Sequence, residues 1–70
     1  MTMTDKMKLQ TYIREIMETL TRAGQIVTIP IVDERPMSRY RAASLQVATR
    51  LGIDVTIRTI DGTLYARRTD

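Results

Sequence analysis

The chain has 70 residues, a formal net charge of +3, and neither cysteine nor histidine. Its length allows one small domain over residues 1–70 with a limited core, which favours stabilisation by self-association, so we predict a homodimer. The composition excludes a disulfide framework and lacks the common zinc ligands, the thiol nucleophile and the usual general base, so we predict no metal, no cofactor and no enzyme activity.

The N-terminal segment MTMTDKMKLQ carries lysines but lacks the apolar stretch of a secretory signal. No apolar run in the sequence approaches the roughly 20 residues that are needed to cross a bilayer. We therefore predict a cytoplasmic protein with no membrane partner.

The first predicted element is a helix over residues 4–23. Its apolar residues follow the three-and-four spacing of one helical face, at Leu9, Tyr12, Ile13, Ile16, Met17 and Leu20. Thr4 and Asp5 would provide the N-terminal cap and a negative charge in the first turn. Gly24 would end the helix as a left-handed C-cap.

Residues 25–32, QIVTIPIV, are predicted to form a strand because β-branched residues dominate them. Both faces of this strand carry apolar groups, so we expect both to meet protein. Pro30 has no N–H to donate, which favours an edge position or a bulge. An edge strand of this kind invites pairing with a second copy of the chain, whereas cover by helices on both faces is the alternative.

A second helix is predicted over residues 37–51, after the turn DERP at residues 33–36. Pro36 or Ser38 would start this helix and Gly52 would end it. The acidic pair in the turn, Asp33 and Glu34, is better explained by capping than by catalysis. The buried side of this helix is expected to hold Met37, Tyr40, Ala43, Ser44, Val47, Ala48 and Leu51.

The last element is a β-hairpin over residues 53–68, with Asp61-Gly62 as its two-residue turn. The order of elements is then α-β-α-β-β, and the fold class is α+β. A right-handed crossover through the second helix could place strand 25–32 parallel to one hairpin strand. We therefore predict a three-stranded mixed sheet packed by two helices.

The net positive charge of the chain comes from its second half. Residues 1–34 hold four basic and five acidic residues, a net charge of −1, whereas residues 35–70 hold seven arginines and three aspartates, a net charge of +4. Such asymmetry favours an anionic partner. An ordinary solvated surface in a protein from an arginine-favouring genome is the alternative interpretation.

Two groups of these arginines point away from the predicted core. On the second helix, Arg39, Gln46 and Arg50 share a stripe with small side chains beside it, which allows close approach to a phosphate backbone. A solvent-exposed helix face would look almost the same. Through the corner at Gly52, this stripe could join the hairpin in one continuous patch.

On the hairpin, the register set by the turn puts Arg58, Tyr65 and Arg67 together on the side away from the core. A guanidinium group beside an aromatic ring can stack on a base or grip phosphates. The alternative is a routine cross-strand pair that contributes at most about 1 kcal/mol to stability.

Residues 42–68, AASLQVATRLGIDVTIRTIDGTLYARR, resemble a pattern of short uncharacterised proteins encoded by actinobacteria and their phages. The shared features are an alanine-rich helix ending in RLG, a V-x-x-R strand, the run DGTLY and a basic end. The resemblance implies such a source and the status of a small accessory protein. It implies no activity and no site residue.

The sequence therefore predicts a small, non-catalytic accessory protein that binds nucleic acid. Arg39, Arg50, Arg58 and Arg67 would contact phosphates, and Gln46 and Tyr65 would lie at or near bases. The alternative is an interaction module that docks on a host protein, or self-associates, through residues 25–32 and the first helix. Apolar docking of that kind would survive salt that removes phosphate contacts.

Overall fold

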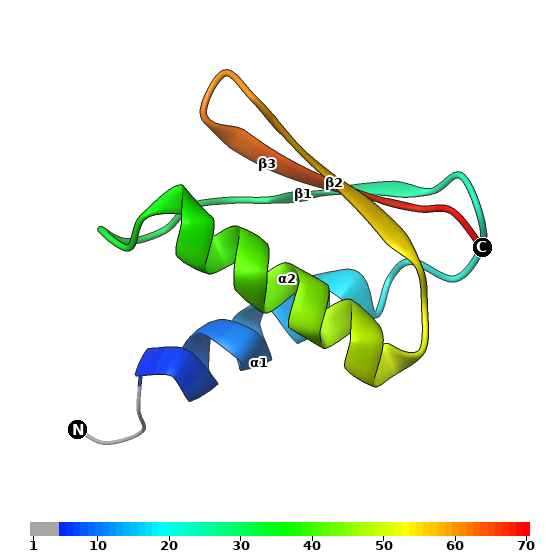
Figure 1. Cartoon of the computed structure of the whole chain (residues 1–70), viewed down its shortest axis with the longest axis horizontal. Coiled ribbons are helices and arrows are strands. Elements are labelled where there is room, and N and C mark those ends of the chain that lie inside the picture. Colours follow the sequence, from blue (N-terminus) through cyan, green and yellow to red (C-terminus); the bar gives the residue numbers. More distant parts are fainter. Residues whose placement is uncertain (1–4) are drawn as a thin grey trace.

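The computed structural model describes the backbone of residues 5–70 and the side chains of residues 8–70 (Figure 1). Its elements are α1 (Asp5–Met17), β1 (Ile26–Ile29), α2 (Met37–Leu51), β2 (Val55–Ile60) and β3 (Thr63–Arg68). The α+β class, the order α-β-α-β-β and the C-terminal hairpin are confirmed. The predicted N-terminal cap, Thr4 with the Asp5 side chain, lies outside this described part.

The sheet is antiparallel throughout, with the strand order β1-β3-β2. The prediction of a three-stranded sheet is therefore right in the number of strands, but the prediction that the sheet is mixed is wrong. Because β1 and β2 are both antiparallel to β3, they run in the same direction, as the crossover through α2 requires. They do not pair with each other, because the tight hairpin folds β3 back into the space between them.

The hairpin has the predicted turn and the predicted register. Asp61 and Gly62 both have positive φ, at 51° and 74°, as a two-residue turn of this kind needs. Across the strands, Arg58 lies opposite Tyr65 and Thr56 lies opposite Arg67. The short-range turn chemistry therefore determines which side chains share a face of the sheet.

The helix α1 ends at Met17, well before its predicted end at residue 23. The side-chain oxygen of Gln25 accepts hydrogen bonds from the backbone N–H groups of Thr21 (2.6 Å) and Arg22 (3.0 Å). In a continuing helix these groups would donate to carbonyls four residues earlier. The chain has already tightened after Met17, with backbone hydrogen bonds from Thr19 to Ile16 (3.2 Å) and from Leu20 to Met17 (3.0 Å), and the Gln25 side chain then takes the place of helical acceptors, so the helix does not resume.

Gly24 does not cap α1, although its φ of 91° is left-handed as predicted. Its N–H donates instead to the carbonyl of Arg68 at the end of β3, at 2.7 Å. Arg68 in turn donates its backbone N–H to the carbonyl of Gln25, at 2.9 Å. This glycine therefore starts the pairing of β1 with β3.

The strand β1 is shorter than predicted, and it ends at Ile29, directly before Pro30. It lies at an edge of the sheet, as the missing N–H of this proline indicated. Only one of its faces is buried within the chain: Ile29 is fully buried, whereas Ile26 is 60% exposed. The expectation that both faces meet protein is thus not met within a single chain.

The two helices lie side by side on one side of the sheet (Figure 1). The helix α1 packs on α2 and β1, and α2 packs on β2 and β3. Gly52, with φ 73°, ends α2 as predicted, and its N–H donates to carbonyls of the last turn. The core between the layers holds Leu9, Ile13, Met17, Leu20, Ile29, Tyr40, Ala43, Val47, Ala48, Ile57, Leu64 and Ala66.

A buried tyrosine ties the turn before α2 to the helix. The Tyr40 hydroxyl donates to the Asp33 carboxylate at 2.9 Å and accepts the backbone N–H of Val32 at 3.2 Å. Asp33 also accepts the N–H of Arg35 at 3.1 Å and lies 3.5 Å from its guanidinium group. Asp33 thus stabilises the turn, whereas the helix N-cap itself is Pro36, with no side-chain cap.

The ionisation of both groups reflects this arrangement. The backbone hydrogen bond from Arg35, followed by the one from the Tyr40 hydroxyl, holds the pKa of Asp33 below its usual value. Burial, together with the neighbouring carboxylate, raises the pKa of Tyr40. The pair is therefore a neutral hydroxyl donating to an ionised carboxylate at neutral pH.

We expect Tyr40→Phe to lower the free energy of unfolding by about 1–3 kcal/mol, because it removes a hydroxyl that both donates to a carboxylate and satisfies a backbone N–H. Tyr12→Phe is the matched control, since its hydroxyl donates to the Pro30 carbonyl at 2.9 Å in an exposed setting. We expect that control to lose less than about 1 kcal/mol. Urea denaturation measures both, and equal losses would contradict the role of Tyr40.

We also expect the stability to depend on the ionisation of Asp33. Because its pKa is lowered in the folded state, its stabilising effect is present above the usual carboxyl pKa of about 3.9 and is lost as the pH falls through the lowered value. The difference in free energy of unfolding between the wild type and Asp33→Asn should therefore shrink below about pH 4. Urea titrations at several pH values measure it, and a difference that stays constant would contradict this expectation.

Candidate nucleic-acid interface

The face of the sheet that points away from the helices is the candidate interface. No element in the described part of the chain covers it (Figure 1). Because side chains alternate along a strand, the strands present every second residue here. We call this surface the open face, and its residues are Ile26, Thr28, Thr56, Arg58, Ile60, Thr63, Tyr65 and Arg67.

Tyr65 and Arg67 lie on the central strand and have neighbours on both sides. Tyr65 lies between Thr28 of β1 and Arg58 of β2. Arg67 lies between Ile26 of β1 and Thr56 of β2. The structure therefore brings together three of the predicted site residues, Arg58, Tyr65 and Arg67.

This part of the open face is hollowed, with a volume of about 450 Å³. The hollow is lined by Ile26, Thr56, Arg58, Ile60, Tyr65, Arg67 and Thr69, none of which is acidic. Arg58 and Arg67 are exposed, and neither forms an ion pair with any residue of the described chain. The two guanidinium groups thus give the open face a positive charge that no described carboxylate neutralises.

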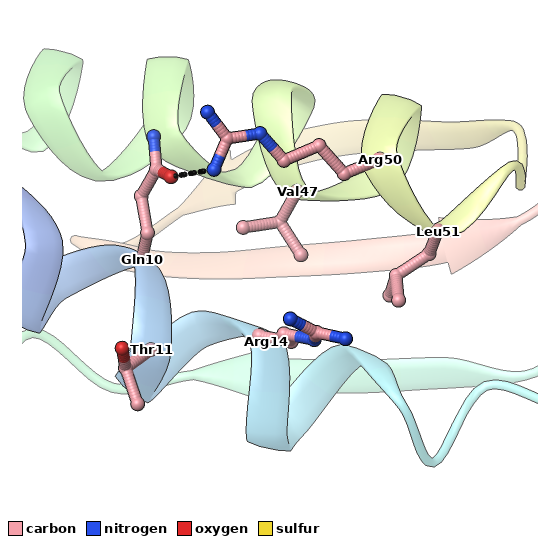
Figure 2. A pocket seen from close by; sticks show the side chains of 6 residues that line it. All are labelled: Gln10, Thr11, Arg14, Val47, Arg50 and Leu51. Carbon is pink, nitrogen blue, oxygen red and sulfur yellow. Dashed lines mark hydrogen bonds between the residues drawn. The ribbon is translucent and has the colours of Figure 1, made fainter.

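The helical stripe lies on a different surface, beside α1. Figure 2 shows the Arg50 side chain extended along α2 and Gln10 reaching from α1 to meet it, with the strands behind both helices. Its guanidinium donates to the side-chain oxygen of Gln10 at 2.6 Å, and the Gln10 amide donates to Gln46. Gln10 therefore joins two of the three stripe residues in a hydrogen-bond network between the helices.

A hollow of about 260 Å³ lies next to this network, lined by Gln10, Thr11, Arg14, Val47, Arg50 and Leu51 (Figure 2). Arg14, at its edge, is paired with Glu18 at 3.1 Å. The third stripe residue, Arg39, is exposed and lines a neighbouring hollow with Gln46. Several hydrogen-bond donors and acceptors of this surface are therefore already used in contacts within the protein.

The stripe and the open face lie on opposite sides of the molecule, separated by the layered helices and sheet. The six predicted residues consequently form two surfaces and not one patch continuous across Gly52. Sequence reasoning also missed Ile26 and Thr28, which join the site only because β1 pairs with β3. It missed Gln10 as well, because no local pattern indicated that this residue would reach α2.

Other kinds of site are not found in the described part of the chain. Within residues 8–70, no three acidic side chains gather in a way that could hold a metal ion. Among the described helices, none has the length and apolar character that crossing a membrane requires.

Comparison with protein-family models, with curated proteins and with solved structures finds no match to this chain. The resemblance of residues 42–68 to actinobacterial and phage proteins therefore stays a prediction. A function for this chain therefore has to be inferred from its own geometry.

A double-mutant cycle measures how much Arg58 and Tyr65 stabilise each other. As a cross-strand pair of an exposed arginine and a half-buried tyrosine, they should contribute a coupling energy of about 0.2–1 kcal/mol to stability. Urea denaturation of Arg58→Ala, Tyr65→Ala and the double variant measures this energy. A coupling energy well above about 1 kcal/mol would instead make the pair part of what holds the hairpin together.

Proposed function

We propose that this protein is a small, non-catalytic nucleic-acid-binding protein and that the open face is its binding surface. The observation that carries the proposal is the placement of Arg58, Tyr65 and Arg67 side by side on an uncovered face whose hollow has no acidic lining. Charge complementarity therefore favours a polyanion as the occupant. The aromatic ring of a tyrosine between two cations favours a polyanion that also carries aromatic bases, which means a nucleic acid.

In this proposal the two arginines contact phosphates and Tyr65 lies against a base. Arg58 and Arg67 are exposed and reach out from neighbouring strands, so both can approach one backbone. The helical stripe of Arg39, Gln46 and Arg50 contributes less to binding in this proposal. Gln46 and Arg50 share hydrogen bonds with Gln10, which leaves Arg39 as its more available cation.

The expected result is salt-dependent binding of a fluorescein-labelled oligonucleotide, measured by fluorescence anisotropy. Each phosphate contact contributes about −0.7 to −0.9 to the slope of log affinity against log salt concentration. Arg58→Ala and Arg67→Ala should each weaken binding and reduce the magnitude of that slope by about one such contact. Arg41→Ala is the matched control, because Arg41 is an exposed arginine of α2 outside both predicted surfaces.

Three outcomes bear on this proposal. Absence of binding to DNA and RNA at low salt would overturn it. Equal losses of affinity in Arg41→Ala and Arg58→Ala would show that net charge alone attracts the oligonucleotide and that the open face is not a specific binding surface. A larger loss of affinity in Arg39→Ala than in either hairpin variant would show that the binding surface lies on the helices and not on the open face.

A second candidate function is docking on a protein, either a host protein or a second copy of the chain. The observation that favours it is the edge position of β1, where Ile26 is 60% exposed and Val32, just beyond the strand, is 63% exposed. Such an edge can pair with another strand. The helix α1 adds little, since Leu9, Ile13 and Met17 are buried in the core. A complex that survives high salt would favour this candidate over the first.

A further inference from the structure

We infer that the open face binds single-stranded nucleic acid by stacking a base on Tyr65. This inference rests on the proposed function and makes it narrower. It names the form of nucleic acid and the contact that selects it.

The ring of Tyr65 is available for such a contact. Tyr12 and Tyr40 both use their hydroxyl groups in hydrogen bonds within the protein, to Pro30 and to Asp33. Within the described chain, the Tyr65 hydroxyl makes no hydrogen bond, and its side chain is only half-buried. The fold therefore gives Tyr65 no structural task comparable to those of the other two tyrosines.

Two exposed isoleucines extend the apolar surface on either side of this ring. Ile60 lies opposite Thr63, and Ile26 lies opposite Arg67, so each is a diagonal neighbour of Tyr65. Diagonal neighbours in antiparallel strands are about 7–8 Å apart. Ile60, Tyr65 and Ile26 thus form a line that crosses all three strands, with exposed fractions of 54% for Ile60 and 60% for Ile26.

The arginines lie directly beside this line. Arg58 is next to Tyr65 across the strands and adjoins Ile60 along β2. Arg67 is next to Ile26 across the strands and adjoins Tyr65 along β3. A chain of bases lying on the apolar line would therefore have its phosphates within reach of one guanidinium group on each side of the central ring.

A single strand fits this pattern better than a duplex does. A duplex keeps the faces of its bases inside the stack and offers mainly phosphates to a protein surface. An apolar line at the middle of the basic face would then have no partner. A single strand can unstack its bases onto aromatic and apolar side chains, as sequence-tolerant binders of single strands do.

The test uses anisotropy with three probes of equal length: a single-stranded oligonucleotide, its duplex, and a single strand with abasic sites at the central positions. We expect the intact single strand to bind at least tenfold more tightly than the abasic strand and the duplex. Tyr65→Leu should lower the affinity for the intact strand about tenfold or more, whereas Tyr65→Phe should keep it within about twofold. Tyr65→Leu should leave the affinity for the abasic strand unchanged.

The possible outcomes distinguish the failure of base stacking from the failure of nucleic-acid binding as such. Equal affinity for all three probes, or no effect of Tyr65→Leu, would overturn base stacking while leaving nucleic-acid binding intact. Absence of binding to every probe would overturn both. Far-UV circular dichroism with thermal unfolding confirms that the variants are folded, which is expected because this side chain lies outside the core.

Discussion

The central position of β3 is the constraint on which the rest of the structure depends. Its inward side chains, Leu64 and Ala66, are fully buried against the helices. Its outward side chains, Tyr65 and Arg67, lie in the middle of the open face because β1 and β2 flank them. Since residues alternate along a strand, one pattern of pairing determines both the core and the candidate interface. A slip of one residue would bury the charge and expose the core.

Arg68 shows how the end of this strand is held in place. It belongs to the basic C-terminal run, yet its guanidinium points to the helix side and donates to the Leu20 carbonyl at 2.8 Å and to Asp70 at 2.8 Å. The hydrogen bond from Arg68 lowers the pKa of Asp70. With the backbone bonds to Gly24 and Gln25, these contacts join the turn after α1 to β3. An arginine counted toward the positive charge of the sequence thus has a structural role.

The sequence predicted the parts of the fold that depend on neighbouring residues. Asp61-Gly62 and Gly52 have backbone conformations that few other residues adopt, so the hairpin register and the end of α2 followed from them. Contacts between distant residues could not be read in the same way. The Gln25 side chain holds the turn that follows α1, and β3 separates β1 from β2, and no local pattern of the sequence encodes either contact. The hairpin half of the site was therefore predictable, and the part on β1 was not.

The distribution of the arginines carries more functional information than their number. Arg35 and Arg68 pair with nearby aspartates, and Arg50 donates to Gln10 across the helices. The two ion pairs offset the charges of Arg35 and Arg68, and the Gln10 contact occupies a hydrogen-bond donor of Arg50, so these three arginines have less to offer a polyanion than the sequence suggests. Arg58 and Arg67 differ because they flank an aromatic ring on a face whose hollow has no acidic lining. The proposed binding of nucleic acid therefore depends on these two residues, and a net charge of +3 spread evenly over the surface would not support it.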